Sequence, residues 1–165
     1  MRSKEKLAKI YQRQARTVYM VAVGYGLQTA DCEDVVQETF MRLLRADPTF
    51  NDSEHEKAWL IVTAANVCKN YLTKSERKNL ALQDWDADGE TPSSEVPPAP
   101  DQDSQLLACL GQLPERLRLT LYLYYYEGYN SQEISEMLGI HPASVRRRLS
   151  EARSLIKKLW KQYEK

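Results

Sequence analysis

The segment from residue 81 to residue 105 most constrains what this chain can fold into. It reads ALQDWDADGETPSSEVPPAPDQDSQ, with seven acidic residues, no lysine or arginine, and repeated prolines and serines. This composition is too polar and too charged to build a hydrophobic core, and it is typical of a flexible linker. We therefore predict two small domains, at residues 1–80 and 106–165, joined by a flexible acidic linker at residues 81–105.

The formal net charge of zero conceals a separation of charge along the chain. The first 80 residues carry 13 basic and 10 acidic side chains, and residues 106–165 carry ten basic and six acidic ones. Both predicted domains are therefore mildly basic, and the linker cancels their charge in the total. A local basic surface favours binding to nucleic acid whatever the net charge of the whole chain.

Cysteine usage and hydropathy exclude several classes of protein. Cys32, Cys68 and Cys109 are far apart and form no CxxC pair, and the two histidines stand alone, so we expect packed thiols, no metal site and no cofactor. No apolar run approaches the ~20 residues that span a bilayer. The charged N-terminus lacks the apolar stretch of a secretion signal. We expect a cytoplasmic protein that does not insert into a membrane.

The first domain is predicted to contain three helices, at about residues 4–25, 31–45 and 56–78, and no strand. Asp31 is a candidate N-cap for the second helix. The apolar residues of that helix recur at helical spacing and predict one buried face, at Val36, Phe40, Leu43 and Leu44. The opposite face carries Asp34, Gln37, Glu38, Met41 and Arg45, and such a face is most often simply solvated.

The third helix pairs an apolar stripe with a row of amides and lysines. Leu60, Ala64, Val67 and Tyr71 form the predicted core stripe. A neighbouring polar row consists of Thr63, Asn66 and Asn70, and basic side chains that include Lys69 gather toward the end of the helix. Amides can read base edges and lysines can hold phosphates. Basic residues near a helix C-terminus also suit the helix dipole, so both interpretations stay open here.

The second domain contains the helix-start and helix-end signals of a helix-turn-helix. Pro114 suits the first turn of a helix that runs through the tyrosines to residue 127, and Gly128 ends it. Ser131 is a candidate N-cap for a short helix, QEISEML. Gly139 supplies a turn with positive φ, and Pro142 opens the last helix. A short helix, a glycine turn and a second helix are the parts of this motif.

Three consecutive arginines lie on the last helix. Val145, Leu149, Ala152 and Ile156 are spaced to form its buried stripe, which places Arg147 on the exposed crest with Arg146 and Arg148 beside it. This is the layout of a helix that enters the major groove, where a central arginine reaches a guanine edge and its neighbours hold phosphates. The alternative is a charged, solvated helix, although no acidic residue interrupts positions 142–150.

These stretches together resemble a bacterial sigma factor of the extracytoplasmic-function (ECF) group, in the sigma-70 family. DCEDVVQETFMRLLR looks like the region 2 helix that binds RNA polymerase, and AWLIVTAANVCKNYL looks like the helix that reads the melted −10 element. LPERLRLTLYLYYYEGYNSQEISEMLGIHPASVRRRLSEAR looks like region 4, which binds the −35 element. The resemblance covers nearly all of the chain outside the linker.

The resemblance implies an all-α fold, three sets of contact residues and a set of partners. The expected −35 contacts are Ser144, Arg146, Arg147, Arg148, Ser150 and Arg153. The expected −10 contacts are Phe50, Asn51, Asp52, His55, Asn66, Lys69 and Asn70, where the loop PTFNDSEHEK matches one that holds a flipped base. The expected polymerase contacts are Asp34, Gln37, Glu38, Met41 and Arg45. The implied partners are core RNA polymerase, through its β′ clamp helices and β flap, promoter DNA, and an anti-sigma factor.

The chain departs from the family pattern at two places. The loop lacks the usual glycine-containing sequence, and RRR is more basic than the common pattern. The promoter sequence that this chain recognises therefore stays open.

Two other classes of function compete with that of a sigma factor. An autonomous helix-turn-helix regulator would need neither the polar face of the second helix nor the Asn66 row. An enzyme acting on nucleic acid would need paired carboxylates, a nucleophile motif or a phosphate-binding glycine loop, and we find none. We expect no catalysis and no small-molecule substrate.

Overall fold

The computed structural model describes residues 3–78 and 111–163. These residues are helical and contain no strand, which confirms the predicted all-α fold with two small helical domains. The chain divides into two compact units, and each is described by itself. The predicted linker at residues 81–105 and the predicted domain boundaries at either end of it lie outside the described residues, so they stay predictions.

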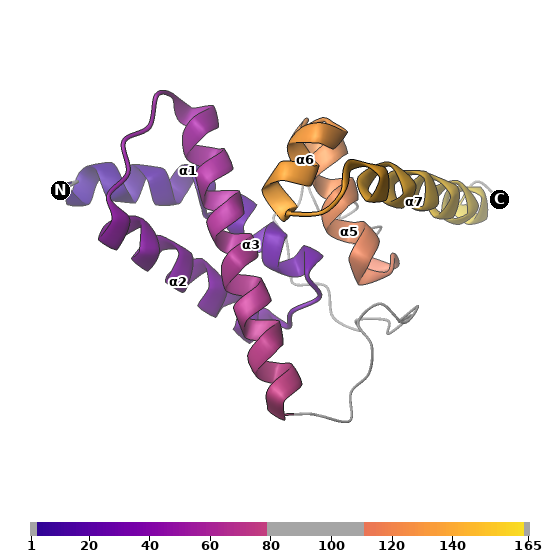
Figure 1. The fold of residues 1–165 in the computed structure, drawn as a ribbon, viewed down its shortest axis with the longest axis horizontal. Coiled ribbons are helices and arrows are strands. Elements are labelled where there is room, and N and C mark those ends of the chain that lie inside the picture. The colour runs from indigo at the N-terminus through magenta and orange to yellow at the C-terminus, as the bar shows by residue number, and fades with distance from the viewer. Residues whose placement is uncertain (1–2, 79–110, 164–165) are drawn as a thin grey trace. The chain divides into compact units, whose positions relative to one another are not determined.

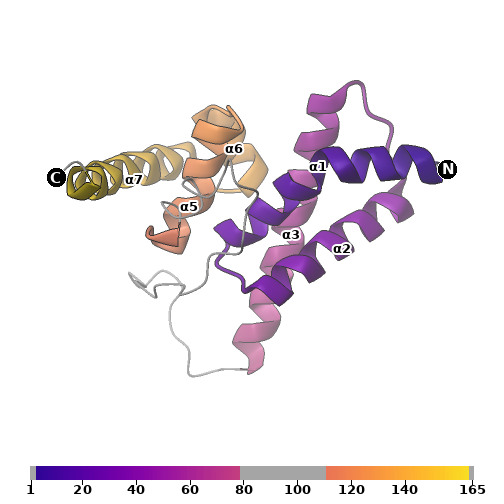
Figure 2. The ribbon, with the colours of Figure 1, turned by 180° about the vertical axis from the view of Figure 1, so that it is seen from behind.

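The first unit contains α1 (Lys4–Gly24), α2 (Thr29–Ala46) and α3 (Ser53–Lys78). Helices α2 and α3 lie side by side (Figures 1 and 2). Val36, Phe40 and Leu43 are buried as predicted, but Leu44 is 39% exposed and does not belong to the core. The buried arc of α2 extends from Val35 to Phe40 around the helix, and Leu44 lies about 40° beyond Phe40, at the edge of that arc.

Helix α1 is attached to its neighbours by a ring contact and by an ion pair to a buried carboxylate. The rings of Tyr11 and Phe40 lie 5.0 Å apart between centroids. The Glu56 side chain is only 8% exposed, and it accepts hydrogen bonds from Arg13 Nη2 at 3.0 Å to each oxygen and from Gln14 Nε2 at 3.1 Å. A buried carboxylate is costly unless it is paired and hydrogen-bonded, so this cluster holds α1 to the start of α3.

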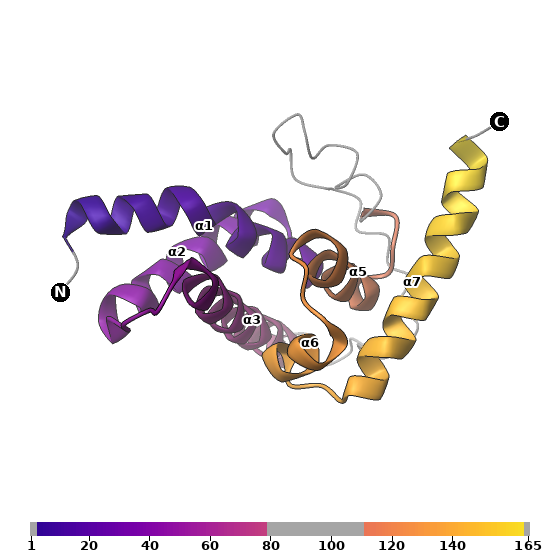
Figure 3. The same ribbon diagram turned by 90° about the horizontal axis from the view of Figure 1, so that it is seen from above.

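The second unit contains α5 (Glu115–Leu121), the π-helix η2 (Tyr122–Tyr126), α6 (Ser131–Leu138) and α7 (Pro142–Tyr163). Helix α7 packs on α5 and α6 and extends beyond them (Figure 3). A single α-helix was predicted through the tyrosines, but its C-terminal part, Tyr122–Tyr126, is the π-helix. Tyr122 is buried, stacks on Tyr126 at 5.1 Å and donates a hydrogen bond to Glu127.

Four helix starts differ from the prediction, one of them that of α3, which begins at Ser53 and not at about residue 56. Helix α6 is capped by Asn130 and not by Ser131, because the Asn130 side chain accepts from the Glu133 N–H at 2.8 Å while Glu133 accepts from the Asn130 N–H at 3.0 Å. Helix α2 begins at Thr29, so Asp31 falls inside its first turn and does not cap it. Pro114 is the residue before α5 and not its first residue. Gly139 has φ 68° and ends α6, as predicted.

Removing the Asn130 side chain tests the assignment of the cap. We expect Asn130→Ala to lower the free energy of unfolding by about 1 kcal/mol, because the Glu133 N–H loses the side-chain oxygen that accepts its hydrogen bond. Ser131→Ala is the matched control and should change the value by less than about 0.5 kcal/mol. Urea unfolding followed by circular dichroism measures both, and a larger loss for Ser131→Ala would restore the original cap assignment.

Cys32 and Cys68 are buried free thiols, which confirms the prediction of packed, reduced cysteines for these two. Burial raises the pKa of Cys32 to about 12, with smaller contributions from the charges of Asp31 and Glu33. Burial also raises the pKa of Cys68 above its usual range. Since the thiolate is the reactive form, both side chains should be inert in the folded protein. Cys109 lies outside the described residues.

The reactivity of these thiols can be counted directly. In a Cys109→Ser variant, we expect no thiol to react rapidly with Ellman's reagent at pH 8, and two to react in denaturant, because only unfolding exposes the sulfurs and returns their pKa to the ordinary range. Absorbance at 412 nm gives the count. Rapid release of one equivalent from the folded variant would contradict the burial of these side chains.

Candidate functional site

Helix α7 presents Arg147 on the face opposite to its buried stripe, with Arg146 and Arg148 on either side of it. Val145, Leu149 and Ala152 are buried, as predicted. Ile156, which was predicted to continue the stripe, is only half-buried. Arg146 and Arg147 are exposed and Arg148 is half-buried. The glycine turn and the bonds from Ser144 and Val145 N–H to His141 O fix where this face begins.

The other predicted contacts on α7 lie in three different settings. Ser150 is exposed and Ser144 is half-buried. Arg153 is exposed, but its Nε donates a 2.6 Å hydrogen bond to the hydroxyl of Tyr125, and its guanidinium lies 5.5 Å from the ring centre of Tyr124. The hydrogen bond to Tyr125 raises the pKa of Arg153. Two rings of the π-helix, the exposed Tyr125 and the half-buried Tyr124, therefore hold this arginine in position, which the sequence did not indicate.

The predicted −10 row on α3 is exposed and shorter than expected. Asn66, Lys69 and Asn70 are all exposed on the helix. Thr63 is half-buried, and its hydroxyl donates to the Trp59 carbonyl at 2.8 Å, so it is engaged with its own helix. The row that faces outward therefore consists of two amides and one lysine.

The loop between α2 and α3 is held by the residues that were predicted to contact DNA. Asp52 Oδ1 accepts from the His55 N–H at 2.8 Å, and His55 Nδ1 accepts from the Asn51 N–H at 3.2 Å. The Phe50 ring makes edge contacts with His55 at 5.3 Å and with Trp59 at 6.0 Å. Asn51, Asp52 and His55 are exposed, and Phe50 is half-buried. These side chains shape the loop as well as lining its surface.

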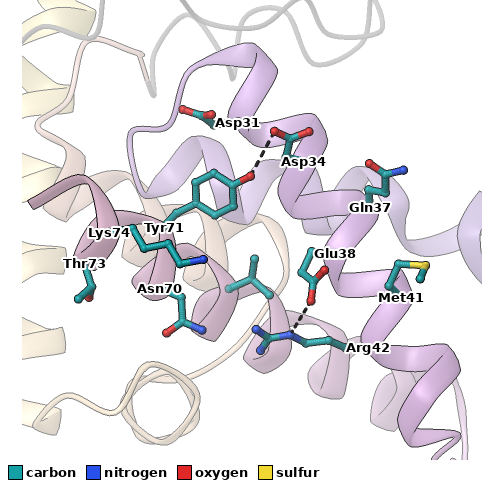
Figure 4. A pocket seen from close by; sticks show the side chains of 11 residues that line it. Asp31, Asp34, Gln37, Glu38, Met41, Arg42, Asn70, Tyr71, Thr73 and Lys74 are labelled. Atoms are coloured by element: carbon teal, nitrogen blue, oxygen red, sulfur yellow. Dashed lines mark hydrogen bonds and ion pairs between the residues drawn. The ribbon is translucent and has the colours of Figure 1, made fainter. Parts of the chain in front are cut away.

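A groove with a volume of about 980 Å³ separates the outer faces of α2 and α3 (Figure 4). Four of the five predicted polymerase contacts line it from α2, and Asn70 of the −10 row lines it from α3. The full lining is Asp31, Asp34, Gln37, Glu38, Met41, Arg42, Val67, Asn70, Tyr71, Thr73 and Lys74. The structure thus brings parts of two predicted sites into one surface.

Hydrogen bonds and ion pairs order the groove. Figure 4 shows Tyr71 pointing from α3 toward Asp34 on α2, to which its hydroxyl donates at 3.2 Å. Burial and then the hydrogen bond to Asp34 raise the pKa of Tyr71. Glu38 accepts from Arg42 at 3.3 Å and from Arg45 at 2.9 Å, and the bond from Arg42 is the main cause of its lowered pKa. Arg45, the fifth predicted contact, reaches the groove only through this pair.

The sequence missed several residues that line this groove. Tyr71 was assigned to the core, but it is half-buried and faces the groove. Arg42 was not predicted, although its spacing of four residues from Glu38 is that of an ion pair on a helix surface. Thr73 carries no signal beyond polarity, whereas Lys74 is one of the basic side chains that gather toward the end of the third helix.

Two further observations concern the described part of the chain. Residues 3–78 and 111–163 contain no cluster of three or more His, Cys, Asp or Glu side chains placed to hold a metal ion. Within the same residues, none of the helices has the length and apolar character needed to cross a membrane.

The helical bundle of the first unit and the arginine-bearing helix-turn-helix of the second define a class of two-domain DNA-binding protein. Residues 10–78 match the family model for sigma-70 region 2, and residues 103–156 match that for sigma-70 region 4. The chain belongs to the sigma-70 family of RNA polymerase sigma factors, in the ECF group. Its function is promoter-specific initiation of transcription.

Curated relatives carry the same description. The chain is 29% identical over 155 residues to the ECF RNA polymerase sigma factor SigM of Bacillus subtilis, covering 92% of this chain and 93% of that protein. It is 28% identical over 138 residues to the ECF RNA polymerase sigma-E factor of Haemophilus influenzae, covering 76% and 72%. It is 28% identical to the probable RNA polymerase sigma factor RfaY of Xanthomonas campestris, covering 86% of this chain but only 37% of that protein.

Two solved structures share the fold. The sigma factor RpoE, in complex with the anti-sigma factor NepR from Bartonella quintana, matches with a TM-score of 0.68 at 20% identity, covering 96% of each chain. CnrH, in complex with the cytosolic domain of CnrY, matches with a TM-score of 0.59 at 21% identity, covering 97% of this chain and 90% of that one. At this level of identity the likeness describes the fold.

Proposed function

We propose that the chain binds core RNA polymerase and selects promoters through three surfaces, with the exposed arginine crest of α7 as the observation that carries the proposal. Burial of Val145, Leu149 and Ala152 leaves Arg146 and Arg147 in solvent on a helix that follows a helix-turn-helix turn. A run-off assay with core polymerase of the host bacterium tests the proposal. Transcripts that share one start position and appear only when the chain is added support the proposal. An autonomous regulator would not produce such transcripts.

The −35 element is bound by the N-terminal half of α7 in this proposal. Arg147 reaches a guanine edge, because an arginine makes two parallel hydrogen bonds to O6 and N7 in the major groove. Arg146, Arg148 and the hydroxyls of Ser144 and Ser150 hold the flanking phosphates and bases. Arg153, which is held by Tyr124 and Tyr125, contributes a positioned positive charge at the side of the groove.

The −10 element is read as a single strand on α3 and its preceding loop. The amides of Asn66 and Asn70 offer donors and acceptors to base edges, and Lys69 offers a charge to a phosphate. Phe50, Asn51 and Asp52 of the loop, with His55 of the first turn of α3, form the site for a base turned out of the stack. Unstacking a base costs a few kcal/mol, which edge hydrogen bonds and stacking on the loop offset.

Core polymerase binds the α2 side of the groove in this proposal. Asp34, Gln37 and Glu38 offer carboxylates and an amide, and Met41 offers an exposed apolar surface that adapts to a partner. Family resemblance assigns this face to the β′ clamp helices and assigns the second domain to the β flap. Because Glu38 already pairs with Arg42 and Arg45, a cation of the partner has to join or exchange with an existing pair.

The proposal also covers catalysis, cofactors, cellular location and regulation. The chain acts as a subunit that lends promoter recognition to polymerase, carries out no catalysis itself, and needs no cofactor or small-molecule substrate. We place it in the cytoplasm, where bacterial polymerase works. Both structural relatives were solved as complexes, one of them explicitly with an anti-sigma factor, and we propose that an anti-sigma factor controls this chain as well.

Arg147→Ala tests the base-reading role. On a promoter located by mapping transcription starts after overexpression, we expect binding at the upstream element to weaken by about 1–3 kcal/mol and sequence preference at one position to relax. The control is Lys158→Ala, an exposed lysine on the same side of α7 but about 16 Å further along the helix. Competition binding with mutated −35 elements measures both. An equal loss on every sequence would make Arg147 a phosphate contact only.

Glu38→Lys tests the polymerase face. We expect weaker binding to core polymerase, because the substitution removes a carboxylate from the groove and places a third positive charge beside Arg42 and Arg45. Binding to the −35 element should be unchanged, since that surface lies in the other unit. Glu33→Lys is the control, with the same change of charge at an exposed site on α2 that does not line the groove.

Co-purification with polymerase and a DNA-binding titration separate the outcomes of the Glu38→Lys experiment. Polymerase binding that survives Glu38→Lys, or falls equally with Glu33→Lys, contradicts the assignment of this face. Loss of polymerase and DNA binding together indicates misfolding, which a melting curve would reveal.

A further inference from the structure

The groove between α2 and α3 carries its uncompensated negative charge at one end. Three carboxylates line it, those of Asp31, Asp34 and Glu38. Glu38 is paired with Arg42 and Arg45, whereas Asp31 and Asp34 form no ion pair with any residue that the structure describes. Those two aspartates are three residues apart on α2, so they face the same side of the helix. A cation of a partner therefore finds its available carboxylates at this end of the groove and not at Glu38.

Tyr71 is the residue of α3 that reaches this end of the groove. Its hydroxyl donates to Asp34 Oδ2 at 3.2 Å, and Figure 4 shows its ring pointing from α3 toward α2. The ring is half-buried and a tyrosine side chain has only two rotatable bonds, so the hydroxyl is held in a narrow range of positions. Asp34 is exposed and would otherwise rotate in solvent. The hydrogen bond therefore fixes the direction of its carboxylate.

The hydrogen bond leaves most of the Asp34 carboxylate available to a partner. An ionised carboxylate has about four lone-pair positions on its two oxygens, and the Tyr71 hydroxyl occupies one of them. A guanidinium or an ammonium group can therefore pair with Asp34 without displacing Tyr71. Burial and the hydrogen bond to Asp34 raise the pKa of Tyr71, so the phenol keeps its proton and remains a donor at neutral pH. The hydroxyl and an incoming cation do not compete.

We propose that Tyr71 is a positioning residue for polymerase binding, which holds the Asp34 carboxylate in the direction in which it pairs with a cationic side chain of core polymerase. A side chain that becomes ordered only on binding loses rotamer freedom, and this loss lowers affinity. Tyr71 orders Asp34 before the partner arrives. This role rests on the proposed function. It adds α3 to the polymerase-binding surface, and it assigns the principal ion pair to Asp34.

Removal of the hydroxyl alone tests the role of Tyr71. In a titration of the labelled full chain with core polymerase of the host bacterium, we expect Tyr71→Phe to raise the Kd about three- to tenfold, the effect of ordering one more side chain on binding. Tyr11→Phe is the matched control, because it removes the hydroxyl of an exposed tyrosine that does not line the groove. It should change the Kd by less than about twofold.

A double-mutant cycle with Asp34→Asn separates positioning from direct contact. The amide has no charge to pair with a cation, so Asp34→Asn alone should weaken binding more than Tyr71→Phe does. In the Asp34→Asn background, Tyr71→Phe should cause no further loss, because no ion pair remains to be prepared. An equal loss in both backgrounds would mean that Tyr71 contacts polymerase itself or that its hydroxyl only stabilises the bundle. Either result overturns the positioning role.

The direction of the effect and the transcription assay decide the remaining outcomes. Tighter binding by Tyr71→Phe would mean that the hydroxyl competes with polymerase for Asp34, which overturns the positioning role. A wild-type chain that directs run-off transcription, with a Tyr71→Phe variant that binds polymerase equally well, overturns that role alone. A wild-type chain that neither binds polymerase nor directs transcription overturns the proposed function, and the positioning role with it.

Discussion

Burial of one face on each long helix is the constraint on which every surface of this protein depends. A helix that commits Val145, Leu149 and Ala152 to the interior has no freedom to rotate, so Arg146 and Arg147 must point to solvent. The same constraint acts on α2, where burial of Val36 and Leu43 turns the polar row outward. The apolar stripes contact neither DNA nor polymerase, yet they decide which side chains can.

Electrostatic pairing inside the first unit serves two different purposes. The half-exposed guanidinium of Arg13 pairs with the buried carboxylate of Glu56, and this pair, together with the hydrogen bond from Gln14, joins α1 to α3. The pair of Glu38 with Arg42 and Arg45 lies at the surface, where an ion pair contributes little to stability. Charges at the surface can be exchanged with those of a partner, which is what a protein-binding face requires.

Aromatic side chains support both of the regions that we propose to bind DNA. Phe50, in the loop before α3, makes edge contacts with His55 and Trp59 of α3, and Arg153 of α7 is held by Tyr124 and Tyr125. In the second domain this arrangement depends on the π-helix, which buries Tyr122 and leaves Tyr125 and Tyr126 at 57% and 42% exposure. Ring contacts of this kind fix the direction of a side chain more firmly than a solvated charge could.

The sequence by itself determined the class of fold, the family and the faces of the helices, because helical periodicity and the glycine turn are local properties of the chain. It placed the arginine crest, the exposed row on α2 and the capped start of α6 to within one residue. Only the tertiary structure decided that Tyr71 lines a groove with Asp34, that Leu44 lies outside the core and that Arg13 pairs with Glu56. Those outcomes depend on how the helices pack against one another, over separations in sequence that no local pattern records.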